Sequence, residues 1–186
     1  MQNTERVKSE RPESAFEGEV VWSPLKSVWF ISNLFVALFI APFVFSFSAF
    51  VVFIFLTAVT LCLGHSLGMH RLLIHRSYEC PKWMEYLFVY LGVLVGMAGP
   101  IGMLLQHDLR DWAQRQKKCH DFLLHGSNIV KDGWWQLNCD LKLKYPPEFT
   151  IEDEVSNNSF YLFIERYWLL QQIVIAIPLY LLGGIP

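Results

Sequence analysis

The longest stretch without a charged side chain is the feature that most restricts the fold of this chain. Residues 27–70, between Lys26 and Arg71, contain no Asp, Glu, Lys or Arg over 44 positions. A single helix of that length would be about 65 Å long, more than a protein of 186 residues could bury in water. One bilayer crossing needs about 20 apolar residues, so the stretch predicts two membrane helices.

Pro42 and the small polar residue Ser46 indicate where this stretch is interrupted. We expect one span near residues 26–44 and a second near 47–66, joined by a tight turn. Residues 26–66 are therefore predicted to form a transmembrane hairpin.

The overall composition supports a membrane protein and excludes several other classes. Hydrophobic residues make up 53% of the chain and charged residues 17%, whereas ordinary soluble domains are roughly 25% charged. The net charge of −2 provides no basic excess for binding nucleic acid. None of the four cysteines belongs to a Cys-x-x-Cys pair, which argues against a zinc ribbon or a thioredoxin-type motif.

Two further apolar stretches follow the hairpin. Residues 86–106 carry no charge but contain four glycines and Pro100, and such residues interrupt a long helix. We expect an interfacial or re-entrant helix there rather than a span. The last apolar stretch is Tyr167–Pro186, and we expect residues 160–186 to form a third transmembrane span.

The remaining segments are polar. Residues 1–25 lack the apolar core of a signal peptide and are predicted to be a poorly ordered tail. Residues 67–159 are predicted to be a cytoplasmic region, with a solvated linker over 126–159. The tail, with Lys26, carries four Lys or Arg and residues 64–159 carry ten. Because positive charge collects on the cytoplasmic side, both ends of the hairpin are placed there, in a multi-pass protein.

All six histidines lie between residues 65 and 125, and two form a His-x4-His pair, His70 and His75, where the second span should end. Imidazole is the commonest metal ligand in proteins, and clustered histidines suit iron, zinc or copper better than magnesium or calcium. On a regular helix two residues five apart diverge by roughly 140°. The pair could therefore serve two ions, or the helix could deform there.

The sequence around this pair resembles a known motif. Residues 64–78 match the pattern Gly-x3-Gly-x-His-Arg-x3-His-Arg-x-Tyr, which is the first histidine box of membrane fatty acid desaturases of the Δ9 acyl-lipid and acyl-CoA type. In that family the box follows the second span. The resemblance implies that His70 and His75 are metal ligands.

A second segment matches the family in part. Residues 111–113, Asp-Trp-Ala, agree with the start of the second box, which continues in the family as His-x-x-His-His. The first two of those histidines fall on Gln116 and Cys119, and only His120 remains. This chain therefore departs from the usual ligand set of the family.

Three interpretations of this departure stay open. In one, His107 and His125 complete a different ligand set, which the second His-x4-His pair, His120 and His125, favours. In another, the protein has lost its metal. In the third, Cys119 binds as a thiolate. A site shared by His70, His75, His120 and His125 requires residues 86–106 to return to the same side of the membrane.

Several other residues have more than one interpretation. Asp108, Asp111 and Arg115 have helical spacing, and Asp111 and Arg115, four residues apart, are expected to form a local ion pair. For these residues we expect ion pairing or support of ligand histidines rather than direct metal binding. His65 could be packed within the span or could bind metal. Three tryptophans are expected to anchor the protein at the membrane interface: Trp112, Trp134 and Trp135.

The resemblance implies an all-α integral membrane helical bundle that desaturates a long acyl chain with O₂ and a histidine-bound diiron centre. It also implies a fatty acyl lipid or acyl-CoA as substrate, and ferredoxin or a cytochrome b5-like protein as electron donor. The alternatives are a related membrane lipid hydroxylase and a truncated or degenerate non-catalytic member of the family. Acyl chain length, double-bond position, carrier and donor stay open.

The family has a third histidine box after its fourth span, and this sequence has no histidine after His125. A chain ending at Pro186 would therefore be truncated at its C-terminal side. With so few ligands, we expect residues 1–186 alone to hold less iron than a complete site and to convert no saturated acyl chains.

Overall fold

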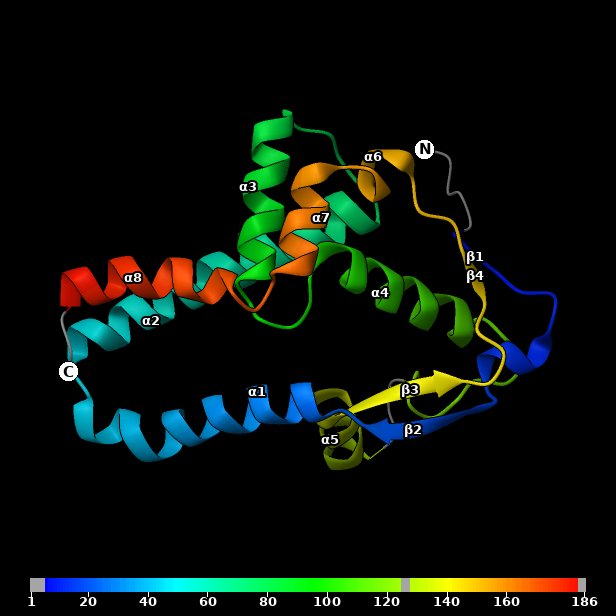
Figure 1. Cartoon of the computed structure of the whole chain (residues 1–186), viewed down its shortest axis with the longest axis horizontal. Coiled ribbons are helices and arrows are strands. Elements are labelled where there is room, and N and C mark those ends of the chain that lie inside the picture. Colours follow the sequence, from blue (N-terminus) through cyan, green and yellow to red (C-terminus); the bar gives the residue numbers. More distant parts are fainter. Residues whose placement is uncertain (1–5, 125–127, 184–186) are drawn as a thin grey trace. The chain divides into compact units, whose positions relative to one another are not determined.

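The computed structural model describes residues 6–124 and 128–183. It divides into two compact units. Unit 1 comprises residues 45–107 and 151–183, and unit 2 comprises 6–44 and 108–150 without 125–127. Helices dominate, as predicted, and the strands that the described residues form all belong to unit 2 (Figure 1).

The first apolar helical segment, Pro24–Val44, has 21 residues and belongs to unit 2. It begins as α1 (Pro24–Phe35), with the proline in the first turn, where its missing N–H costs no hydrogen bond. It ends in a short π-helix and a 3₁₀ turn, η2 (Val36–Ile40) and η3 (Ala41–Val44). At 1.5 Å per residue the segment is about 30 Å long, the thickness of a hydrocarbon core.

The second apolar segment, Phe47–Ile74, has 28 residues and belongs to unit 1. It starts as α2 (Phe47–Val59) and continues as the π-helix η4 (Thr60–Ile74). Ser46 caps its start by accepting the Ala49 N–H at 3.2 Å. The described residues therefore contain two helices long and apolar enough to cross a bilayer, as predicted, but the second extends well beyond residue 66. Their antiparallel pairing as a hairpin stays a prediction.

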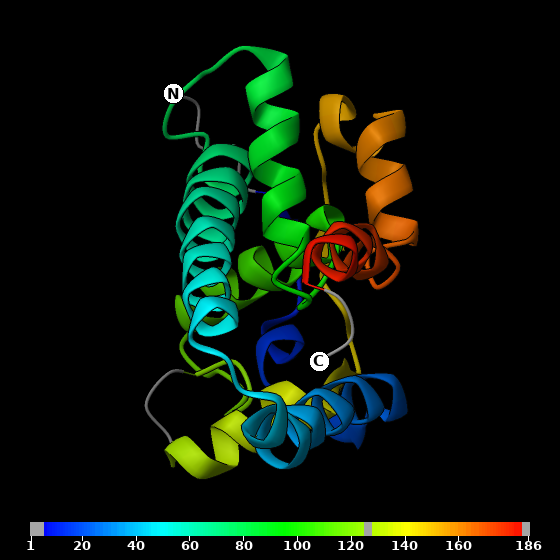
Figure 2. The same cartoon turned by 90° about the vertical axis from the view of Figure 1, so that its left-hand side faces the viewer.

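Glycines allow α3 (Lys82–Val93) to pack closely against η4 in unit 1. A Cβ atom at Gly64 would lie less than 3.0 Å from the backbone of Leu91, and one at Gly68 equally close to that of Phe88. Figure 2 shows α3, in green, running beside the teal η4. The core of this unit consists of Met69, Leu73, Ile74, Val89, Val93, Leu104, Val155, Tyr161 and Ile164.

Residues 86–106, where an interfacial or re-entrant helix was expected, belong to two helices separated by a turn. The chain forms α3, a turn, and then α4 (Pro100–Gln114). Gly96, in the turn, has a φ of 77°, a left-handed conformation that side chains disfavour. The two helices have 12 and 15 residues, too few for a crossing of about 20, so the segment is no continuous span.

The third span expected over residues 160–186 is also not one straight helix. After α6 (Asp153–Ser156), the chain forms α7 (Ser159–Arg166) and α8 (Gln171–Gly183). Their axes differ by 77°, so that together they resemble a broken span or a re-entrant pair. Residues 184–186 lie outside the described chain.

The N-terminal segment of unit 2 is ordered, contrary to the expected irregular tail. β1 (Val7–Lys8) pairs with β4 (Glu148–Phe149), and η1 (Pro12–Ala15) follows. β2 (Gly18–Trp22) pairs with β3 (Cys139–Leu143) in antiparallel register from Gly18 opposite Leu143 to Trp22 opposite Cys139. The expected linker over 126–159 thus supplies α5 (Ile129–Asn138) and two strands. The unit's core is formed by Val7, Ala15, Trp112, Ala113, Phe122, Leu123 and Cys139.

Glu165 of α7 holds the start of α4. Its Oε2 accepts the N–H groups of Ile101 at 2.8 Å and Gly102 at 3.1 Å, where the helix dipole favours negative charge. Glu165→Gln should lower the free energy of unfolding in detergent by about 0.3–1 kcal/mol, and Glu165→Ala by about 1–3 kcal/mol because two donors lose their partner. Glu79→Gln, in an exposed loop, is the control. Equal stability of all three variants would contradict the capping role.

Candidate metal centre

His70 and His75 lie near the end of η4, and the π-helical geometry sets their relative position. A π-helix pairs each N–H with the carbonyl five residues earlier, and the His75 N–H donates to the His70 carbonyl at 3.0 Å. Residues five apart therefore lie on one face. The Nε2 atoms of the two imidazoles are 3.2 Å apart. Of the two arrangements that the sequence left open, the structure has the deformed helix.

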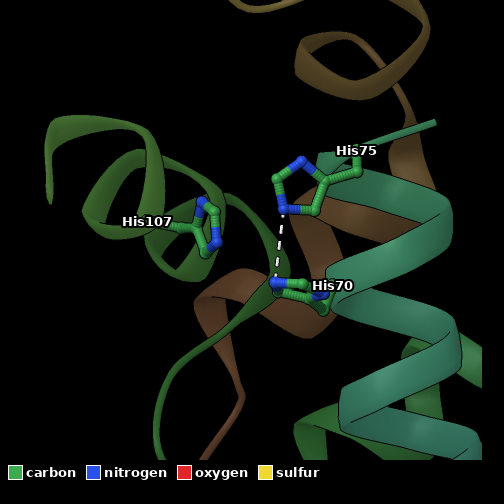
Figure 3. Close-up of side chains that lie close together, drawn as sticks. All are labelled: His70, His75 and His107. Atoms are coloured by element: carbon green, nitrogen blue, oxygen red, sulfur yellow. Dashed lines mark hydrogen bonds between the residues drawn. The ribbon is translucent and has the colours of Figure 1, made fainter. Parts of the chain in front are cut away.

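His107 of α4 completes a group of three imidazoles within unit 1. Its ring centroid lies 5.1 Å from that of His70 and 4.9 Å from that of His75. One nitrogen from each ring lies within 4.8 Å of the others. Figure 3 shows the three rings facing a common point: His70 belongs to η4, His75 follows it directly, and His107 belongs to α4. His70 and His75 are exposed, whereas His107 is half-buried.

Apolar packing beneath the histidines fixes this arrangement. Leu104 lies three residues before His107 on α4 and therefore on the same side of that helix. It is fully buried in the core that includes Met69 and Leu73 of η4. The packing of these side chains holds the two elements that carry the imidazoles together.

A sharp turn after His75 brings the chain back along η4. Arg76 has a φ of 48°, which costs a side-chain-bearing residue roughly 1–2 kcal/mol. The turn is closed by the Ser77 N–H, which donates to the Arg71 carbonyl at 2.8 Å. The Tyr78 hydroxyl donates to the Leu67 carbonyl at 3.1 Å. Burial raises the pKa of Tyr78, which keeps that hydroxyl protonated.

The three imidazoles could hold a metal ion, and the spacing of His70 and His75 fits two ligands of one ion. Two nitrogen ligands at about 2.1 Å from an ion are separated by about 3.0 Å at a right angle and about 3.4 Å at a tetrahedral angle. The 3.2 Å between the His70 and His75 nitrogens falls in this range. Neutral imidazoles favour iron, zinc or copper. Three protein ligands also leave positions free for water or a substrate.

His65 is not a member of the group, although it precedes His70 by the same five residues. It lies one π-turn deeper in the apolar segment and is half-buried. Its Nδ1 has no hydrogen-bond partner among the described residues. Of the two interpretations left open for His65, the observed position therefore gives no support to metal binding together with His70.

His120 belongs to unit 2, and local contacts hold its ring. Its Nδ1 accepts the Phe122 N–H at 3.1 Å, and burial lowers its pKa. Gln114 and Gln136 hold the following residues by donating to the carbonyls of Leu123 and Phe122. His125 lies outside the described residues. The convergence of His120 and His125 with His70 and His75 therefore stays a prediction.

Burial raises the pKa of the Cys119 thiol. Cys119 is half-buried. A thiol with a raised pKa is less readily deprotonated, and only the thiolate is a good metal ligand. This weighs against the interpretation of Cys119 as a ligand.

Asp108 forms an ion pair with a residue that is distant in the sequence. Arg6 Nη1 lies 3.1 Å from Asp108 Oδ2, and both side chains are largely buried.

Trp112 is 6% exposed in the core of unit 2, which corrects its expected role as a membrane anchor. Trp135 stacks on Phe122, whereas Trp134 is exposed.

Comparison with known proteins found similarity to curated desaturases. The chain is 36% identical over 157 residues to the sn-2 palmitoyl-lipid 9-desaturase of Nostoc sp. (strain 36), covering 79% of this chain and 52% of the relative. It is 34% identical over 145 residues to the sn-1 stearoyl-lipid 9-desaturase of Anabaena variabilis, covering 75% and 50%. The acyl-CoA 5-desaturase of Anemone leveillei is 30% identical over 151 residues, covering 78% and 45%.

The chain thus spans about half the length of the curated relatives it matches. No family model matches it. No solved structure matches it either.

Proposed function

Since the chain belongs to the family of membrane fatty acid desaturases, we propose that its three-histidine group is a metal centre for desaturating long acyl chains. The observation that carries the proposal is the convergence of His70, His75 and His107 at the end of a 28-residue apolar helix. An acyl chain held in a bilayer can reach a site at such a position.

We propose iron as the metal. Bound iron would supply the oxidation with O₂ that unactivated C–H bonds require, which side-chain acid–base chemistry cannot provide. His70, His75 and His107 would hold one ion, and three protein ligands leave positions open. A second iron would need further ligands, for which His120 and His125 are the remaining predicted candidates.

The substrate and partners follow from the family as proposals. The relatives named above act, by their names, on acyl lipids or on acyl-CoA, so the substrate of this chain is a fatty acyl lipid or acyl-CoA. Electrons would come from ferredoxin or a cytochrome b5-like protein. The charge distribution supports a multi-pass orientation with the histidines on the cytoplasmic side.

A chimera tests the proposed function. Residues 1–183 are joined to the part of the Nostoc relative that follows the matched region, and the chimera is expressed with an electron donor in cells that lack a desaturase. We expect a new double bond in the cell lipids, measured by mass spectrometry of their fatty acids.

The matched control is the same chimera with His107→Ala, because His107 belongs to the three-histidine group but lies outside the motif around His70 and His75. We expect it to form no double bond while reaching the membrane in equal amount. A hydroxylated fatty acid would instead favour the lipid hydroxylase. Equal desaturation by the control would contradict the proposed role of the three-histidine group.

A further inference from the structure

One side of α5 in unit 2 is apolar and exposed. The exposed fractions are 86% for Ile129, 76% for Val130, 58% for Trp134 and 41% for Leu137. At 3.6 residues per turn these four side chains fall within a sector of about 140°. Gly133 lies in the same sector, and a Cβ atom there would meet nothing within 4 Å. We call these four side chains the apolar face of α5.

The opposite side of α5 fixes the direction of the apolar face. Trp135 stacks on Phe122, with ring centroids 6.0 Å apart and planes inclined by 29°. Gln136 donates to the Phe122 carbonyl at 2.9 Å, and Asn138 is buried. These contacts turn the apolar face away from the core of unit 2.

The end of α5 is joined to the start of α1 in the same unit. The Ser23 N–H donates to the Asn138 carbonyl at 2.8 Å. Lys26 Nζ donates to the Cys139 carbonyl at 3.0 Å and lies 2.6 Å from Asp140 Oδ1. Figure 1 shows α5 beside the first turns of the blue α1. α5 therefore ends where the first apolar segment, Pro24–Val44, begins.

We propose that α5 lies on the surface of the bilayer, with its apolar face in the boundary between lipid headgroups and acyl chains. A helix that crosses the hydrocarbon core must begin at one of its two surfaces. The contacts with Ser23 and Lys26 place α5 at that level, whichever side it is. Amphipathic helices with a Trp on the apolar side bind this boundary.

The charges of α5 indicate that apolar contact, rather than electrostatic attraction, binds this helix to the bilayer. Lys131 and Asp132 are its only charged residues, and they cancel. Lys131 also lies 3.7 Å from Asp121 and 4.2 Å from the centroid of the Trp135 ring. Binding should therefore depend little on anionic lipids, unlike that of basic interfacial helices. The surface anchor is independent of the proposed metal centre.

Photo-crosslinking of the full chain in phosphatidylcholine nanodiscs tests this proposal. A photoreactive benzoylphenylalanine is introduced at position 130 or 134 on the apolar face, or at position 131, which is also exposed, as a control. We expect lipid adducts as the main product at 130 and 134, and few at 131. Mass spectrometry of the digested protein measures them.

Two other outcomes would overturn the proposal. Equal lipid adducts at 131 and 134 would show that no face is oriented toward the bilayer. Crosslinks between two copies of the chain at 130 and 134 would show that the face is a dimer contact. Replacing a third of the lipid by phosphatidylserine should leave the yield at 134 unchanged, and a rise above about threefold would show electrostatic binding instead.

Discussion

Protein purified with His75→Ala should retain only background iron after reconstitution with Fe²⁺ under anaerobic conditions. His75 supplies one of three nitrogens that lie within 4.8 Å of one another, and the group has no fourth member to replace it among the described residues. Loss of an outer-shell partner alone weakens metal affinity by 10–100-fold, so loss of a direct ligand should cost at least about 100-fold. His70→Ala and His107→Ala should have the same effect. Elemental analysis gives the iron content per chain.

The matched control is His65→Ala. It removes an imidazole from the same π-helix, one turn from His70, without touching the group. We expect its iron content to equal that of the unchanged protein, at no more than one ion per chain. His107→Ala with unchanged iron would contradict the three-histidine group. Loss of iron in His120→Ala would show that His120 of unit 2 contributes to the same ion.

The two apolar helices could be predicted because the signal is chemical rather than geometric. Charged side chains are costly in a bilayer, so 44 positions without one leave few alternatives. The break between the two helices was also predictable from a residue type, because Ser46 is a common helix-capping residue and its side chain caps the second helix. The family motif around His70 and His75 was equally readable, since it depends on residue identity at fixed spacing.

The relative position of the histidines could not be predicted, because it depends on the type of helix. In an α-helix, with 3.6 residues per turn, the directions of His70 and His75 differ by roughly 140°. No residue pattern in this segment distinguishes an α-helix from a π-helix. The close packing of η4 could have been predicted, because Gly64 and Gly68 are four residues apart, a spacing typical of closely packed helices. His107 was named only as one possible substitute, and its place in the group depends on the packing of Leu104.

The strand pairs of unit 2 were missed because their partners are distant in the sequence. Val7 pairs with Phe149, and Gly18 with Leu143, so each partner lies more than a hundred residues away. Polar residues along both segments favoured a tail and a linker. The apolar face of α5 had a readable signal in the helical spacing of Ile129, Val130, Trp134 and Leu137, which the linker interpretation overlooked.

Gly68→Ala should destabilise unit 1 by at least about 3 kcal/mol, the upper end of the usual cost of overpacking. The added methyl group would lie less than 3.0 Å from the backbone of Phe88. A backbone cannot turn aside as a flexible side chain can, so α3 would have to move away from η4. That movement would open the packing of Met69 and Val89, which belong to the same core.

Gly133→Ala is the matched control, because a Cβ atom there meets nothing within 4 Å. Alanine in the interior of α5 should stabilise the helix by about 0.5–1 kcal/mol relative to glycine. Gly→Ala is thus expected to lower stability at position 68 and to raise it at position 133. The midpoint of thermal unfolding in detergent measures both changes. Because His70 lies two residues after Gly68, the Gly68→Ala variant should also lose iron. If it kept both its midpoint and its iron, the close packing of α3 on η4 would not be what positions the metal centre.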